Sequence, residues 1–140
     1  LHILEYTGGK LHIPTISTKK SLELIKKAKS KGLNVTCSVA VHNIIFNDKK
    51  LKDFDTRFKV LPPLREEKDR LALVKGVKSG IIDMVTSDHF PIDLENKKTD
   101  IGSAKYGTIG LESLFGSLLS LFDLNKTIEI LTRGREIFSI

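Results

Sequence analysis

The sequence has little of three residue types: one cysteine, two tyrosines and no tryptophan occur among its 140 residues. A single cysteine cannot close an internal disulfide, so a disulfide-stapled fold is excluded and a reducing, cytoplasmic compartment is expected. No apolar run approaches the roughly 18 residues of a membrane span, and no signal peptide is recognisable. Neither a P-loop nor the Gly-x-Gly-x-x-Gly fingerprint is present, so these nucleotide-binding classes are not predicted.

The net charge is +6, but the basic residues are spread along the chain. One predicted helix carries six lysines: Lys19, Lys20, Lys26, Lys27, Lys29 and Lys31. Few aromatic residues alternate with them to stack on bases. We therefore expect a solvated basic face, with neither a nucleic-acid nor a membrane partner.

Strand-like and helix-like segments alternate along the chain. Three β-type runs are predicted, at residues 11–13, 34–39 and 81–85. The helical predictions cover residues 17–32, 65–79 and 110–124, and a shorter helix followed by an end strand over 125–138. The run at 81–85 is continuously apolar, which is typical of a strand buried on both faces of a parallel sheet. This order predicts an α/β fold with a parallel sheet.

Apolar residues at helical spacing predict the buried stripes of the first two helices. These residues are Leu22, Leu24, Ile25 and Ala28, and then Leu71, Leu73, Val74 and Val77.

Polar side chains follow each predicted strand, where α/β proteins place their chemistry. Asp88 and His89 end the third strand, and His42 ends the second. Asp88 could ligate a divalent metal or act as a general base, or it could simply cap a helix or form a turn. His12 and Cys37 lie inside strands, and both are more simply read as packed residues. A metal site needs three or more converging ligands, and the spacing does not force such a set.

Three segments carry a resemblance to a known family. They are "LHIPTISTKKSLELIKKAKSKGLNVTCSV", "FKVLPPLREEKDRLALVKGVKSGIIDMVTSDHFP" and "KYGTIGLES". In order and spacing they resemble dihydroorotases of the cyclic-amidohydrolase superfamily. The resemblance implies a (β/α)₈ barrel that holds one or two zinc ions at the carboxyl ends of its strands. Residues 1–140 would form a single fragment, the C-terminal portion of that barrel, with its last three strands.

Residue by residue, the resemblance holds at Asp88, which stands where the family has a metal ligand and general base. Tyr106 and Gly107 stand where the family's backbone contacts the substrate. Thr15 replaces a zinc-binding histidine, because the family's His-Val-Ser-Thr reads Thr-Ile-Ser-Thr here. Leu61 stands in place of a substrate-contacting asparagine, and Ile92 in place of a substrate-binding histidine.

These replacements predict a protein that kept the fold and lost the reaction of pyrimidine biosynthesis. We expect no zinc to be bound by this fragment. It would associate with itself or with the remaining part of the barrel, and a silent subunit could scaffold aspartate carbamoyltransferase. Two alternatives stay open: an active dihydroorotase with altered ligands, or an amidohydrolase that acts on a more apolar cyclic amide.

Overall fold

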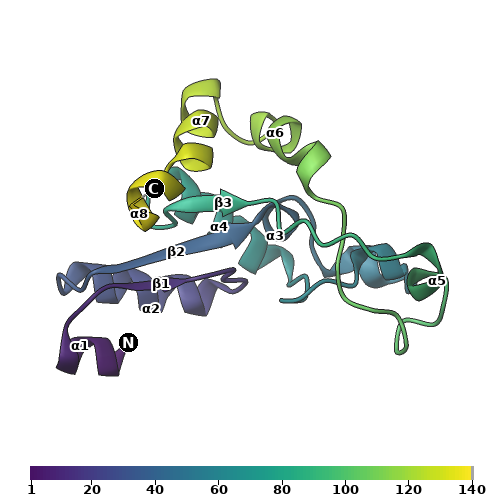
Figure 1. Ribbon diagram of the computed structural model, residues 1–140, viewed down its shortest axis with the longest axis horizontal. Coiled ribbons are helices and arrows are strands. Elements are labelled where there is room, and N and C mark those ends of the chain that lie inside the picture. Colours follow the sequence, from purple (N-terminus) through teal and green to yellow (C-terminus); the bar gives the residue numbers. More distant parts are fainter. Residues whose placement is uncertain (140) are drawn as a thin grey trace.

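A computed structural model describes residues 1–139. Three parallel strands, β1 (Leu11–Ile13), β2 (Val35–Ala40) and β3 (Met84–Thr86), form a sheet in the order β1-β2-β3 (Figure 1). Ile13 lies opposite Cys37, and Ala40 lies opposite Thr86. All three strands therefore end at the same edge of the sheet. The predicted α/β class with a parallel sheet is confirmed.

Two long helices cover one face of this sheet (Figure 1). They are α2 (Lys19–Ser30) and α4 (Glu67–Lys78). Thr18 caps α2, since its hydroxyl accepts the backbone N–H of Ser21. Cys37 and Val39 of β2 pack into the core, whereas the side chain of Thr36 contacts His12. The sheet thus has an apolar, helix-covered face and a more polar one.

The remaining elements are short and surround the sheet. They are α1 (His2–Thr7), α3 (Val41–Ile45), the 3₁₀ turns η1 (Asp48–Leu51) and η2 (Thr56–Phe58), α5 (Leu94–Lys97), α6 (Leu111–Leu119), α7 (Leu124–Thr132) and α8 (Gly134–Phe138). In Figure 1, α1 and α8 lie toward the amino ends of the strands, and α5 lies far beyond their carboxyl ends. No helix within residues 1–139 is long and apolar enough to cross a bilayer.

Three sequence predictions about these elements were wrong. The expected end strand is absent from the described chain, because α7 and α8 place Ile130 and Ile137 in the interior at helical spacing. The third strand is shorter than predicted, because the N–H groups of Ile81 and Ile82 both donate to the Gly76 carbonyl in a turn. Leu24 and Leu71 lie outside the predicted buried stripes, with exposures of 51% and 46%.

A buried ion pair ties α2 to the start of β3. Lys29 Nζ lies 2.8 and 2.7 Å from the two carboxylate oxygens of Asp83, and it also donates to the Ile81 carbonyl at 2.9 Å. The backbone N–H of Cys37 donates to the same carboxylate at 2.8 Å. Asp83 thereby joins α2, the middle of β2 and the start of β3.

Candidate functional site

The carboxyl ends of the strands bring one histidine and one carboxylate together. His42 follows β2 on α3, and Asp88 follows β3. His42 Nε2 lies 3.6 Å from Asp88 Oδ2. Asp88 is partly open to solvent, with 37% of its side chain exposed, whereas His42 is buried. The two strand-end candidates chosen from the sequence therefore do meet.

The backbone at two of these strand ends is left-handed. Thr15 has φ 49° and Asp88 has φ 47°, a region that costs energy for most L-residues and more for a β-branched one. Ser38 holds the first of these turns, because its hydroxyl accepts the Thr15 N–H at 3.2 Å and its carbonyl accepts the Ile16 N–H at 2.9 Å. Strained backbone of this kind concentrates at functional sites.

Burial dominates the chemistry of His42. Its side chain is only 6% exposed, and both ring nitrogens lack a hydrogen-bond partner within the described residues. Burial lowers the pKa of His42, and the nearby Asp88 carboxylate opposes this only in part. The imidazole is therefore neutral at pH 7.

His89 faces a different partner. Its Nδ1 accepts the backbone N–H groups of Gly110 and Leu111, each at 3.3 Å, at the start of α6. A Cβ at Gly110 would lie 2.1 Å from the Ser87 carbonyl oxygen, so only glycine allows this approach. His89 thus fastens the loop after β3 to α6, and that ring nitrogen is not available to a metal.

The two predicted substrate-contacting residues lie against this same loop. Thr108 accepts the Phe90 N–H at 2.9 Å, and the Gly107 N–H donates to the Lys59 carbonyl at 3.1 Å. Gly107 has φ 135°, and a Cβ there would lie 2.5 Å from the Phe90 carbonyl oxygen. The ring of Tyr106 lies 4.8 Å below the Lys59 ammonium. Residues 106–108 are thereby fixed beside both neighbouring segments.

The side chains of Lys59 and Lys97 hold residues 97–105 against residues 56–59. Lys59 Nζ donates to the carbonyls of Ile101 and Gly102, at 2.6 and 2.9 Å. Lys97 Nζ donates to the carbonyls of Thr56 and Lys105, at 3.0 and 2.9 Å. Burial lowers the pKa of Lys97, and the neighbouring Lys59 lowers it further. Both ammonium groups donate to backbone carbonyls, so they do not form an open anion-binding site.

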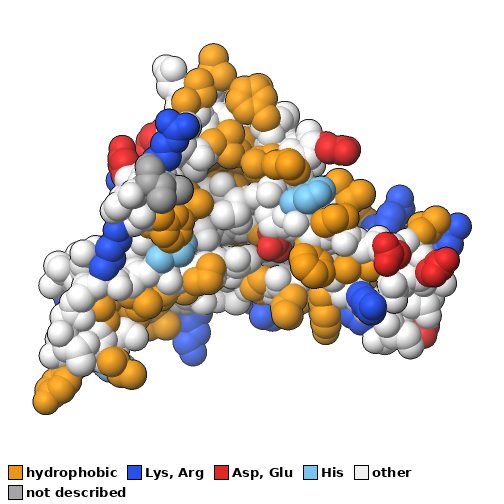
Figure 2. Space-filling view, viewed as in Figure 1, with side chains coloured by type: hydrophobic (Ala, Val, Ile, Leu, Met, Phe, Trp, Pro, Cys, Tyr) orange, Lys and Arg blue, Asp and Glu red, His pale blue; other side chains and the backbone are white. Residues whose placement is uncertain are grey.

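Several large apolar side chains are exposed on the segments that follow the strands. Leu61, Phe90 and Ile109 are exposed by 64%, 62% and 60%, and Ile92 lies beside Gly107. Figure 2 shows apolar side chains gathered on this face of the molecule. Sequence reasoning missed Phe90, Ile109 and the buried Ser38. The alternation of Thr36 and Ser38 with apolar residues along β2 was the available signal for Ser38.

The donor set does not fit a bound zinc ion. Within residues 1–139, no group of three His, Cys, Asp or Glu side chains converges to hold a metal. His12 Nδ1 and Nε2 contact the hydroxyls of Thr36 and Ser38, at 2.9 and 3.3 Å. Cys37 is fully buried, and burial raises the pKa of its thiol to about 11, so it is neither a nucleophile nor a thiolate ligand.

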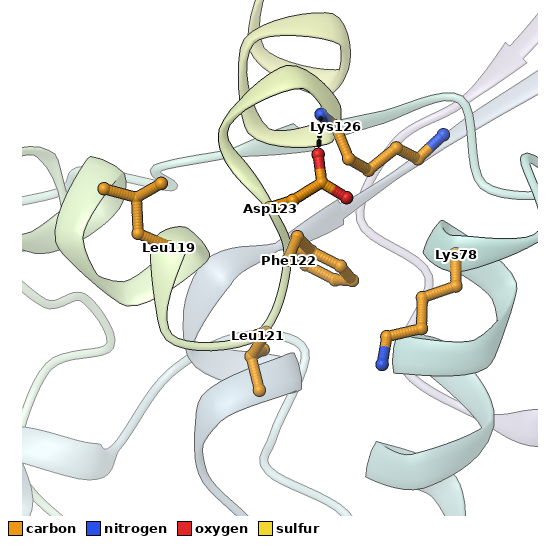
Figure 3. Close-up of a pocket in the computed structure, with 6 residues that line it drawn as sticks. All are labelled: Lys78, Leu119, Leu121, Phe122, Asp123 and Lys126. Carbon is orange, nitrogen blue, oxygen red and sulfur yellow. Dashed lines mark hydrogen bonds between the residues drawn. The ribbon is translucent and has the colours of Figure 1, made fainter.

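Two cavities deserve comparison with this site. One of about 130 Å³ adjoins the strand ends, and its lining includes His42, Thr108, Gly110, Ser113 and Ser117. A larger one of about 440 Å³ lies near the turn between α6 and α7, where Phe122, Asp123 and Lys78 line it (Figure 3). Asp123 there caps α7 by accepting the Lys126 N–H at 2.9 Å (Figure 3). The larger cavity is remote from Asp88, so the strand ends remain the candidate site.

No family model matches the chain, but many curated proteins do. It is 39% identical over 137 residues to a dihydroorotase of Brevibacillus brevis, covering 93% of this chain and 32% of that protein. It is 43% identical over 116 residues to a dihydroorotase of a Thermoanaerobacter species, covering 83% of this chain and 27% of that protein. The chain thus spans about a third of the length of these relatives.

Solved structures show the same fold. An L-hydantoinase from Arthrobacter aurescens superimposes with a TM-score of 0.87 at 24% identity, covering 99% of this chain and 33% of that one. A dihydroorotase from Saccharomyces cerevisiae, in complex with 5-fluoroorotic acid, superimposes with a TM-score of 0.84 at 15% identity, covering 97% of this chain and 40% of that one. The three strands and their helices therefore share the fold of part of these proteins, and the expected partial (β/α)₈ barrel is confirmed.

Proposed function

Because this chain is a homologue of dihydroorotases over nearly its whole length, we propose that it serves in a protein of that family and is itself catalytically silent. Dihydroorotases open and close a cyclic amide in pyrimidine synthesis, and their resemblance to this chain implies zinc. A cytoplasmic location suits the single, buried cysteine.

One observation carries the proposal of silence. Three parallel strand ends meet, yet within residues 1–139 they present only two accessible metal-binding side chains, Asp88 and His89, and Nδ1 of His89 is already engaged by backbone N–H groups. Thr15 offers a neutral hydroxyl, a poor zinc ligand beside an imidazole. His42 is closed off from solvent. A catalytic zinc needs about three protein ligands and an open position, so this set falls short.

The substrate-facing positions support the same proposal. Leu61 and Ile92 cannot hydrogen-bond a polar ring, and the ammonium groups of Lys59 and Lys97 are engaged by carbonyls. A charged dihydroorotate would find few partners among these residues. Gly107 still offers a backbone carbonyl beside the loop of Asp88.

A second function is favoured by the apolar side chains near Asp88. Leu61, Phe90 and Ile109 are largely exposed, Phe90 closely follows Asp88 in the chain, and Ile109 lines the cavity beside His42. They suit an amidohydrolase that acts on a more apolar cyclic amide. In that case the missing ligands would come from elsewhere in the protein.

A catalytically silent homologue that keeps its fold can still act by binding a partner protein. We propose aspartate carbamoyltransferase as its partner, because the two reactions are consecutive in pyrimidine synthesis. Purification of the intact protein from its own cells should then retain carbamoyltransferase activity.

The deciding assay is dihydroorotate hydrolysis by the intact protein with added zinc. We expect no turnover, and little recovery from Thr15→His alone, because a lost metal ligand removes the hydroxide nucleophile. Thr15→His combined with Leu61→Asn and Ile92→His should recover more. Robust turnover by the unmodified protein would refute silence, and turnover only of apolar cyclic amides would support the second function.

A further inference from the structure

His42 is a buried residue with an unmet need for hydrogen bonds. Both of its ring nitrogens are inaccessible, and neither has a partner within the described residues. Leaving such groups unpaired in the interior is costly, so the structure around them must supply partners. On the Nε2 side, the Asp88 carboxylate lies 3.6 Å away, just beyond hydrogen-bond length.

The cavity of about 130 Å³ lies against the same ring. The hydroxyl-bearing residues Thr108, Ser113 and Ser117 contribute to its lining. It is large enough for a water molecule, and these residues offer the two to four polar partners that a buried water needs. Both ring nitrogens of His42 are closed to solvent, however, so the nearby Asp88 carboxylate remains the partner that the described residues offer to Nε2.

The position of His42 argues against a role as metal ligand. Its nitrogens are closed off, whereas Asp88 is open on its other side. Its helix neighbours Val41 and Ile44 are buried in the core, so α3 cannot easily swing the ring outward. Asp88, in contrast, sits on a left-handed turn that needs a neighbour to hold it.

We propose that His42 is a positioning residue for Asp88. The imidazole carries its proton on Nε2 and donates it in a hydrogen bond to Asp88 Oδ2, and Nδ1 is left without a proton in the interior. This restrains Oδ2 of a carboxylate whose side chain is otherwise 37% exposed. The inference rests on the proposed function only in taking Asp88 as the acid of the site.

The first test reads the tautomer in the intact protein. Long-range ¹H–¹⁵N correlation spectra of ¹⁵N-histidine-labelled protein should show His42 protonated on Nε2 and bare on Nδ1. A proton on Nδ1 alone would overturn the proposal, because Nε2 could then not donate to Asp88. Direct coordination of His42 to added zinc would overturn it as well.

The second test follows the carboxyl ¹³C shift of Asp88. His42→Ala should move this shift toward that of a solvated aspartate, and His42→Gln, which keeps a donor near the Nε2 position, should largely restore it. His12→Gln is the matched control, since His12 bonds to Thr36 and Ser38 and should leave Asp88 unchanged. An Asp88 shift that ignores both His42 variants would refute the proposal.

These readouts separate the inference from the proposed function. Neither measures turnover, so a silent protein can still confirm the tautomer and the shift. Should His42→Ala not fold, the tautomer of the unmodified protein decides alone.

Discussion

Thr15 is held in a conformation that its own side chain disfavours. It has φ 49°, although it is β-branched. The turn is enforced from outside, because the buried Ser38 accepts the Thr15 N–H and Ile16 is buried directly after it. The left-handed backbone at Thr15 is therefore held by neighbouring residues, although a threonine side chain disfavours it.

Substituting this residue should stabilise the fold. Asparagine tolerates the left-handed region, so Thr15→Asn should raise the free energy of unfolding by about 1 kcal/mol. Urea unfolding followed by circular dichroism would measure this. Thr99→Asn, at an exposed position without a positive φ, is the control and should change little. A destabilised Thr15→Asn would show that the threonine side chain contributes more than its backbone costs.

Single site residues were predictable only where the strand pattern located them. Asp88 and His42 follow apolar or alternating strands, so their meeting at one edge could be expected from parallel topology. The positive φ of Thr15 could not, because it depends on Ser38 from the neighbouring strand. Phe90 and Ile109 were missed since each joins the site through contacts between distant segments.

At the level of elements, local sequence signals predicted the helices whose ends they mark clearly. The helices predicted over residues 17–32 and 65–79 were read correctly from sequence, since α2 and α4 begin and end within two residues of these bounds. The end of the chain was misread because Ile137 and Phe138 suit a strand as well as a helix. In the folded chain, Met84 approaches Gly134 and Ile137 is buried, so tertiary packing accompanies the helical outcome.

The Lys29–Asp83 pair should be the costliest ion pair to break. Asp83→Ala leaves a half-buried ammonium and the Cys37 N–H without their acceptor, so we expect a loss of about 3 kcal/mol. Chemical denaturation would measure it. Glu5→Ala is the control, because its pair with Lys31 is exposed and should contribute nothing measurable. Equal losses in both variants would contradict the central role of Asp83.

Acid should loosen the link between α4 and the segment before η1. Hydrogen bonds from Arg70 and Asn47 lower the pKa of Glu67 to about 2. A depressed pKa means stability that is present above the unfolded value of 4.5 and lost as pH falls toward 2. The destabilisation by Glu67→Gln should therefore shrink over that window in thermal unfolding. Glu66→Gln, which removes only an exposed partner of Lys68, should show no such trend.

On the scale of the whole molecule, the sheet is open. β1 and β3 each pair on one side only within the described residues. Barrel strands normally have neighbours on both sides, and unpaired parallel edges favour association. The chain also spans only about a third of the length of its relatives.

The isolated chain should therefore not remain a monomer. We expect size-exclusion chromatography with light scattering to show oligomers whose mass rises with concentration. Adding the polypeptide that precedes this segment in the natural protein should suppress them. A stable monomer at high concentration would contradict this expectation.

The long loop that carries α5 is closed at its base, which we call its neck, by two backbone hydrogen bonds. The Phe90 N–H donates to the Thr108 carbonyl, and the Gly107 N–H donates to the Lys59 carbonyl. The far end of the loop is exposed and makes few contacts with the sheet, as Figure 1 shows. A short epitope or a fluorescent label spliced between Lys98 and Thr99 would thus be carried outside the barrel without disturbing the neck. A fluorophore placed in this segment would lie beside the candidate site, and a change in its fluorescence could then report the binding of a ligand.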